Sequence, residues 1–220
     1  RDSRPDAAET AALAAAGTPV HPNTTVGRRY AGPEEAEVTE LGAKIYLPSG
    51  YLNIAIFDQE IKGFQSNTFV GTGFVLANAG TQSVDGYEFD LLFSPIENID
   101  IALGGTFIDP IYDSFTGSAF GDLSGTVPSN IADDTISSSV TWNWDRNGWD
   151  GYMRLSHLYS SEAVLTENPA AQALLESRGN GFREQDTLNF SAGMQKDNLS
   201  ISLWGKNIND DEFITSVFPA

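Results

Sequence analysis

The chain has 220 residues, of which 40% are hydrophobic, and 30 acidic against 12 basic residues give it a net charge of −18 at pH 7. This length suits a single domain, and the acidic balance argues against a nucleic-acid groove, because binding to a phosphate backbone needs a basic surface. The chain contains no cysteine, which excludes disulfides, thiolate nucleophiles and cysteine-ligated zinc.

The first 35 residues lack the pattern of a strand. The start, RDSRPDAAET, has no apolar segment and is therefore no signal peptide. The stretch AAETAALAAA (7–16) is rich in helix formers and predicts a short surface helix. The chain has no run of about 18 apolar residues, so no transmembrane helix is predicted. A membrane β-barrel is compatible with this, since its strands alternate and never give such a run.

Alternation of apolar and polar residues recurs eight times and predicts eight strands. They cover residues 36–47, 51–63, 84–94, 99–109, 134–144, 149–160, 186–196 and 199–208. Most run for about ten to twelve residues, the length that a tilted strand needs to cross a bilayer. In 84–94 one face carries Tyr87, Phe89, Leu91 and Phe93, and the other carries Gly86, Glu88 and Asp90. A soluble β-sandwich alternates in the same way, so alternation alone does not separate the two architectures.

The connections between these strands alternate in length. Short connections lie at 48–50, 95–98, 145–148 and 196–198, and long ones lie at 64–83, 110–133 and 161–185. Long loops without structure are uncommon in compact soluble domains, whereas short turns at one rim and long loops at the other are typical of outer-membrane barrels. The sequence therefore predicts an all-β, antiparallel up-and-down meander of about eight long strands.

Three local features accompany this pattern. NPAAQALLESRG (168–179) predicts a helix, with Pro169 near its start and Gly179 past its end. In 64–83 the apolar portion TFVGTGFVLAN is expected to fold over as a hairpin or to line a mouth where a ligand enters. Aromatic residues near the short turns favour an interfacial girdle at that rim over ordinary strand aromatics. These are Tyr46, Tyr51, Phe93, Trp142, Trp144 and Trp149.

The sequence offers little support for catalysis. His21 and His157 are the only histidines, and Ser156 would point to the opposite face of a strand from His157. No nucleophile elbow, HExxH, EF-hand or P-loop pattern is present, so we expect no enzyme activity, no cofactor and no metal site. The connection 110–133 carries acids without Lys or Arg, which favours a solvated acidic loop over a site for a cationic ligand. These acids, with the adjoining Asp134, are Asp113, Asp122 and Asp133.

Three segments together resemble TonB-dependent receptors. GPEEAEVTELGAKIYLPSGYLNIAIFDQEIKGFQ is similar to that family's Pro-Glu…Glu-Leu-Gly-x-Lys segment with its turn and apolar strand. NAGTQSVDGYEFDLLFSPIENIDIALGGTFID resembles the following Asn-x-Gly…Gly-x-Glu hairpin, and LWGKNINDDEFITSVFPA resembles the segment before the last strand. The matching positions are Pro33, Glu34, Glu40, Leu41, Gly42, Lys44, Asn78, Gly80, Gly86, Glu88, Asn207 and Asp210, while Phe213 stands where the family has Tyr.

This resemblance implies a barrel of about 22 strands around an N-terminal plug, in the outer membrane of a Gram-negative bacterium. Residues 36–220 would supply the last third of that barrel, without the plug or the final strand, and residues 1–35 would be an extracellular leader. With short turns in the periplasm, both chain ends would lie outside, which also predicts a fragment of a longer barrel. The partners would be outer-membrane lipid, the plug, the remaining strands, and the TonB complex through the plug.

The implied function is active uptake of a bulky, scarce nutrient such as a ferric siderophore, a vitamin or a glycan. Glu88, Asp90, Asp100 and Arg154, with Glu40, are the candidates for contact with ligand or plug, although the interior of a barrel is polar in any case. Two alternatives stay open at this point. One is a stand-alone eight-stranded barrel of the porin or adhesin type, and the other is a soluble β-sandwich binding module.

Overall fold

A computed structural model describes residues 12, 15–16, 32–70, 73–78, 80–116, 118 and 120–217. Eight long antiparallel strands form one sheet, and two short strands form a separate hairpin. The large sheet contains β1 (Glu35–Leu47), β2 (Gly50–Lys62), β5 (Thr81–Ile96), β6 (Ile99–Ser114), β7 (Asp134–Arg146), β8 (Trp149–Val164), β9 (Phe182–Lys196) and β10 (Leu199–Gly205). The hairpin contains β3 (Gln65–Val70) and β4 (Gly73–Asn78), and helix α2 covers Pro169–Ser177.

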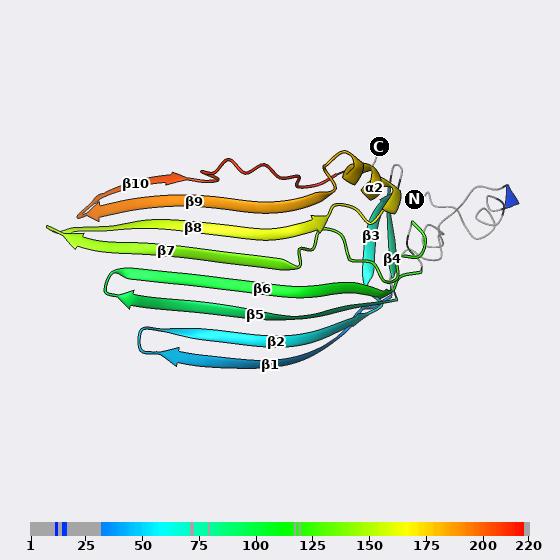
Figure 1. The fold of residues 1–220 in the computed structure, drawn as a ribbon, viewed down its shortest axis with the longest axis horizontal. Helices are drawn as coiled ribbons and strands as arrows, with labels where there is room; N and C mark the ends of the chain where they lie inside the picture. The colour runs from blue at the N-terminus through cyan, green and yellow to red at the C-terminus, as the bar shows by residue number, and fades with distance from the viewer. Residues whose placement is uncertain are drawn as a thin grey trace.

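The large sheet is a meander with the strand order β1-β2-β5-β6-β7-β8-β9-β10. Among the described residues it is open, because β1 pairs only with β2 and β10 pairs only with β9. The short turns lie at one end of the sheet, and α2 and the β3–β4 hairpin lie at the other (Figure 1). The predicted eight-stranded meander is confirmed, and the closed eight-stranded ring is not supported. The hairpin forms within 64–83, one of the two structures expected there.

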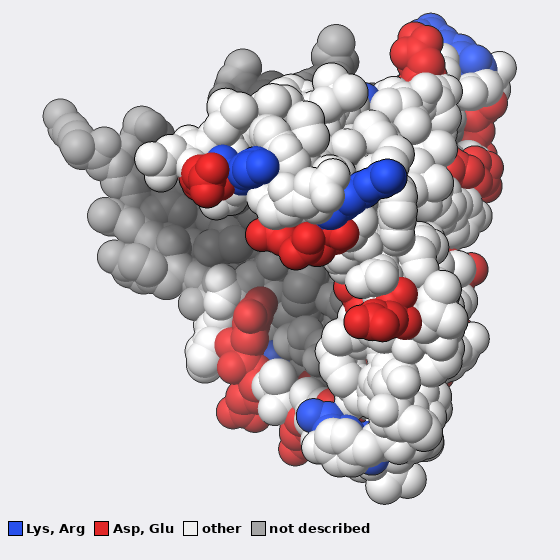
Figure 2. Space-filling view, turned by 90° about the vertical axis from the view of Figure 1, so that its left-hand side faces the viewer, with Lys and Arg blue, Asp and Glu red and all other residues white. Residues whose placement is uncertain are grey.

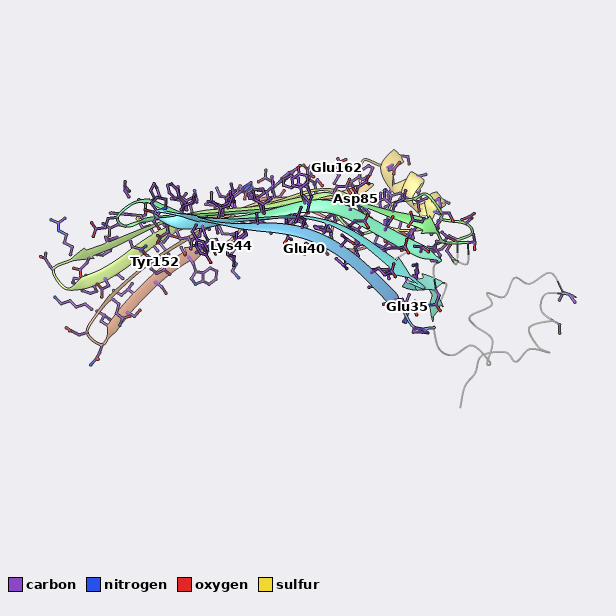
Figure 3. All side chains as sticks on the ribbon, turned by 90° about the horizontal axis from the view of Figure 1, so that it is seen from below. Glu35, Glu40, Lys44, Asp85, Tyr152 and Glu162 are labelled. Carbon is purple, nitrogen blue, oxygen red and sulfur yellow. The ribbon has the colours of Figure 1, made fainter. Side chains whose placement is uncertain are left out.

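The register of pairing sorts the two kinds of residue onto opposite faces. Leu41, Ile56, Tyr87 and Phe107 are paired in turn across β1, β2, β5 and β6, so their side chains share a face. The neighbouring row on the opposite face consists of Gly42, Ala55, Glu88, Thr106 and Thr135. Seen edge-on, the sheet is arched, with Glu40, Lys44 and Tyr152 on its concave side and Asp85 on its convex side (Figure 3).

The apolar convex face is uncovered. Leu41 is 72% exposed, Ile56 is 54% exposed and Tyr87 is 49% exposed. Within the described part of the chain, each long strand packs extensively only against its neighbours in the sheet, and α2 and the hairpin do not form a second layer on it. A β-sandwich needs a second sheet against this face. The sandwich alternative is therefore not supported.

Several strands run further toward the long connections than alternation predicts. β5 begins at Thr81, β6 ends at Ser114 and β8 ends at Val164. The backbone ladder continues there, since Gln82 pairs with Tyr112, and Thr81 pairs with Ser114 beyond a register shift. At this level the polar side chain of Gln82 is buried and the apolar side chain of Ile111 is 37% exposed, so alternation no longer marks the strand. The alternation therefore predicts strands that are shorter at this end than the strands of the structure.

The short connections are two-residue turns, tighter than the three or four residues predicted. Arg146 pairs with Trp149 around Asn147 and Gly148, whose backbone φ angles are 56° and 75°. Two successive positive φ angles are typical of a type I′ turn, which matches the twist of a hairpin and favours Asn-Gly. Asn98 and Asp197 also have positive φ angles, 77° and 50°, at the corresponding turns.

β10 ends at Gly205, three residues before the predicted end of its strand at 208, because Asn207 has a φ of 50° and leaves the extended conformation. Beyond Gly205 the chain stays bonded to β9 through the backbone at Ile208, whose amide donates to Leu188 O at 2.8 Å, and through side chains. Asn209 Oδ1 accepts a hydrogen bond from the Leu188 amide at 2.8 Å, and Asp211 Oδ2 accepts one from the Asp186 amide at 2.8 Å. The Asn and Asp side chains of this segment thus add to its bonding with β9 beyond the regular strand.

Helix α2 confirms the helix predicted at 168–179. Asn168 is its N-cap, and Oδ1 accepts hydrogen bonds from the amides of Ala170 and Ala171 at 3.1 and 3.2 Å. Gly179 follows the C-cap with a φ of 73°, the conformation that glycine adopts most easily. No described helix is long and apolar enough to cross a membrane. The helix predicted at 7–16 lies outside the described residues except for Ala12, Ala15 and Ala16.

Replacing Asn168 by alanine is expected to destabilise α2 by about 1 kcal/mol, since two amides of the first turn lose their acceptor. Hydrogen exchange of the amides of residues 170–177 should then rise in the folded protein, while exchange in β7 stays unchanged. Asn168→Ser is the matched control, because serine also caps helices. Equal exchange in all three proteins would contradict this role of Asn168.

Candidate functional site

The concave side carries an open hollow of about 540 Å³ in the middle of the sheet. It is built by five neighbouring strands, β1, β2, β5, β6 and β7, whose inward positions are charged, polar or small. Its inward side chains belong to Glu40, Lys44, Asn53, Glu88, Asp90, Thr106, Thr135 and Ser137. Gly104, also in the lining, lets the wall recede between Asp90 and Ser137, its partners on the neighbouring strands.

The structure brings four of the five predicted contact residues, Glu40 among them, to this wall. Glu88 and Asp90 line the hollow, and Asn53 Nδ2 donates a hydrogen bond to Asp90 Oδ2 at 3.2 Å. Asp90 and Arg154 both line an adjoining hollow of about 260 Å³ between β5 and β9. The wall therefore presents carboxylates, an amide and a guanidinium toward the same concave space.

Asp100 lies apart from these residues, near the short turns. Its Oδ1 accepts a hydrogen bond from Ser94 Oγ at 2.7 Å, and its Oδ2 accepts one from Asn143 Nδ2 at 2.8 Å. Both carboxylate oxygens thus join β6 to the strands on either side of it, β5 and β7. This placement gives Asp100 a structural task, in contrast to the residues of the hollow.

Lys44 and Asn53 are members of the hollow that the sequence analysis missed as site residues. The alternation of side chains already indicated Lys44, because Lys44 lies four positions after Glu40 in β1 and therefore points to the same face. Asn53 is the partner of Lys44 in β2. Lys44 places a positive charge in a lining that otherwise carries Glu40, Glu88 and Asp90. A ligand or protein segment on this wall would therefore meet both signs of charge.

The aromatic residues at the short-turn rim divide between the two faces. Trp142, Trp144 and Phe93 share the convex face with the apolar row, whereas Tyr46 and Tyr51 pair with each other on the concave face. The prediction that all six aromatic residues form a girdle is therefore wrong for these two tyrosines. Tyr46 lies two positions after Lys44 on β1 and Tyr51 is its partner on β2, so both share the concave face with Lys44. Lys196 Nζ lies 5.9 Å from the ring centre of Trp149, and Figure 2 shows basic and acidic side chains interspersed at this end.

Aromatic rings also cover glycines on the neighbouring strand. Phe89 pairs with Gly105 on the convex face, and Tyr152 pairs with Gly193 on the concave face. A Cβ on Gly105 would lie 2.6 Å from Phe89 Cε1, and one on Gly193 would lie 2.6 Å from Tyr152 Cε1. The rings thus occupy the space that a side chain would need, an arrangement that pins the register of paired strands.

Serines donate hydrogen bonds to Asp113 at the end of β6 and to Asp122 in the connection between β6 and β7. Ser83 Oγ donates to Asp113 Oδ1 at 3.0 Å, and the Ser124 amide and hydroxyl donate to Asp122 Oδ1 at 2.9 and 2.6 Å. These bonds lower the pKa of Asp122. Burial raises the pKa of Asp133, and the charges of Asp134 and Asp109 raise it further.

The two shifts predict opposite effects of pH on this connection. Because its pKa is raised, Asp133 binds its proton more tightly in the folded protein than in the unfolded chain. Ionisation of Asp133 near neutral pH therefore lowers the free energy of unfolding. Asp133→Asn should therefore slow hydrogen exchange of the connection at neutral pH. Asp122→Asn should accelerate exchange at neutral pH, and this difference should vanish as acid protonates Asp122. Effects of the same sign at neutral pH would contradict the assignment.

His157 and Ser156 lie on opposite faces of β8, as predicted. His157 Nε2 and Asp186 Oδ1 are 2.6 Å apart on the convex face, while Ser156 lines the hollow that Asp90 and Arg154 share. Among the residues that the structure describes, no group of three His, Asp or Glu side chains is placed to hold a metal ion.

The family model for the β-barrel of TonB-dependent receptor-like proteins matches residues 3–208. The chain belongs to this family. No curated protein matches the chain.

Solved structures of this family share the fold. The ferric yersiniabactin uptake receptor FyuA from Yersinia pestis is 19% identical, with a TM-score of 0.66 over 85% of this chain and 27% of its own. BauA, the ferric preacinetobactin receptor from Acinetobacter baumannii, is 14% identical, with a TM-score of 0.62 over 82% of this chain and 26% of its own. The FrpB iron transporter from Neisseria meningitidis (F3-3 variant) is 19% identical, with a TM-score of 0.58 over 83% of this chain and 28% of its own. The chain thus spans about a quarter of the length of these proteins.

Proposed function

We propose that this chain forms part of the wall of a TonB-dependent receptor in the outer membrane of a Gram-negative bacterium. The receptor takes up a bulky, scarce nutrient, with a ferric siderophore as the first substrate class to test. The observation that carries the proposal is the two-faced sheet: apolar residues cover the convex face, and charged and polar residues line the concave hollow. Lipid on one side and a wet lumen on the other require this arrangement.

The structural neighbours support the choice of substrate class. FyuA and BauA are described as receptors for ferric siderophores, and FrpB is described as an iron transporter. At 14–19% identity they share the fold with this chain, so the substrate itself is part of the proposal. Energy from the TonB complex would reach the receptor through a plug domain inside the complete barrel.

Uptake by cells tests this proposal directly. The complete receptor is expressed in a strain that lacks its own siderophore receptors, and accumulation of radioactive iron is measured from trihydroxamate and triscatecholate chelates. Uptake that requires both the receptor and TonB supports the proposal. Uptake of cobalamin or of an oligosaccharide instead would retain the receptor but replace the substrate class. Accumulation that persists without TonB would contradict active transport.

Substitutions in the wall then test the predicted contact residues. Asp90→Asn and Arg154→Gln are expected to alter uptake while the amount of receptor in the outer membrane stays constant, because both side chains face the concave hollows. Asp100→Asn is the contrasting variant, since it disturbs the bonds to Ser94 and Asn143 and should lower the amount of assembled receptor. Unchanged uptake in both wall variants would leave these residues as part of an ordinary polar interior.

A further inference from the structure

Among the described residues, the largest fully buried side chains lie where β6 passes into its long connection, at Pro110, Tyr112 and Phe115. Tyr112, Phe115 and Leu123 are 1%, 0% and 2% exposed and form one cluster, with Phe64 packed against it. The rings of Tyr112 and Phe115 meet edge to face at 5.0 Å, and those of Phe64 and Tyr112 lie 5.8 Å apart. The end of β6 and the connection that follows it therefore share a small apolar core.

Backbone bonds fold this connection back onto the end of β6. The Tyr112 amide donates to Thr126 O at 3.0 Å, and the Gly125 amide donates to Tyr112 O at 2.6 Å. Deeper in the loop, the Leu123 amide donates to Phe115 O at 3.0 Å, and the Phe115 amide donates to Ser124 Oγ at 2.8 Å. The connection is thus a built structure and not an extended loop.

The connection between β8 and β9 is organised around Gln172 of α2. Its Oε1 accepts a hydrogen bond from the Leu165 amide at 3.2 Å, and its Nε2 donates to Gly181 O at 2.6 Å. These two bonds tie the helix to the segments that precede and follow it. Leu165, 4% exposed, anchors the start of the connection. A displacement of this segment therefore moves α2 with it.

A side-chain bond links the end of β6, onto which its connection folds back, to the connection between β8 and β9. Tyr112 Oη donates to Glu167 Oε1 at 2.7 Å, across 55 positions of the sequence. The Asn130 amide also donates to Val164 O at 2.8 Å, and Arg183 Nη2 donates to Asn130 O at 2.9 Å. All these contacts lie at the long-connection end of the sheet, where a ligand would enter in the proposed orientation.

We propose that the Tyr112–Glu167 bond is a positioning joint that ties the connection between β8 and β9 to the end of β6, and so to the connection folded back onto that end, as one preformed unit at the mouth of the receptor. This inference rests on the proposed uptake function. Binding to connections that are already ordered avoids the entropy cost of ordering them, so the joint raises affinity without touching the ligand. Burial and the neighbouring Glu167 raise the pKa of the Tyr112 phenol, which keeps its proton available for the bond.

The first experiment measures the joint without any ligand. Tyr112→Phe in the complete receptor removes the hydroxyl and keeps the ring in its cluster. Hydrogen exchange should rise roughly tenfold in both 115–133 and 165–181, the factor expected for one hydrogen bond to a carboxylate. Glu167→Gln, which keeps an acceptor, should restore most of the protection that Glu167→Ala loses. Tyr159→Phe is the matched control, because its hydroxyl lies 3.4 Å from Glu184, between strands outside both connections.

The second experiment measures uptake of the iron chelate that the wild-type receptor accumulates. Tyr112→Phe should raise the chelate concentration for half-maximal uptake by up to about tenfold, at an unchanged maximal rate per assembled receptor. Unchanged exchange in 165–181 would overturn the joint. A lower maximal rate with an unchanged half-maximal concentration would overturn the positioning role. If no chelate is transported, the proposed function fails, and the exchange experiment still decides the joint.

Discussion

Replacing Phe89 by arginine is expected to block assembly of the receptor in the outer membrane. Phe89 lies on the convex face, paired with Ile54 and Gly105, and its ring stacks on Phe107 at 6.3 Å. An arginine near the middle of the lipid face costs about 2–4 kcal/mol, and the loss of the ring also uncovers Gly105. The measurement is the amount of receptor that reaches the outer membrane in a folded form.

Glu88→Arg is the matched control, because Glu88 is the next residue on the same strand and faces the concave hollow. A charge in a wet lumen costs little, so assembly should remain intact while uptake changes. The pair of variants also tests the register, since a shift by one residue would exchange the two faces. If Glu88→Arg blocks assembly and Phe89→Arg does not, the assignment of lipid and lumen faces is inverted.

Phe115→Ala is expected to open the connection between β6 and β7. Phe115 is fully buried, and removing a buried aromatic side chain costs about 3–5 kcal/mol through lost burial and the cavity that remains. Hydrogen exchange across 115–133 should then approach that of an unstructured segment, while the strands stay protected. The receptor should still assemble, because the cluster lies beyond the apolar part of the convex face.

Val127→Ala is the control for this prediction, since Val127 is 44% exposed in the same connection. Its effect should stay within about 0.5 kcal/mol, as for most surface substitutions. Equal exchange in the Phe115 and Val127 variants would show that the apolar cluster does not hold the connection. Loss of the whole sheet in Phe115→Ala would show that barrel and connection fold as one unit.

The strands and their faces were accessible from the sequence because they depend on a local rule. Side chains alternate along a strand, so the apolar positions of Tyr87, Phe89 and Leu91 share one face whatever the neighbouring strands are. Connection lengths then fix the order of antiparallel neighbours. The helix at Pro169 followed from local signals as well, since Asn168 and Gly179 act within one turn of it.

The missed features depend on contacts between segments distant in sequence. The bonds of Asp100 to Ser94 and Asn143, the pairing of Asn209 and Asp211 with β9, and the extra length of β5 and β6 need the register of the assembled sheet. Alternation marked Lys44 as inward, but only the sheet shows which inward residues meet in one hollow.

The sequence by itself determined the all-β meander, the two faces of each strand and the resemblance to TonB-dependent receptors, because these follow from period-two patterning and short motifs. The tertiary structure decided which residues share the concave wall, and it decided that the end of β6 and its connection build a buried core. The physical reason is that the burial of Tyr112 and Phe115 and the bond from Tyr112 to Glu167 form between segments that are distant in sequence. No pattern in the neighbouring residues predicts that these segments meet.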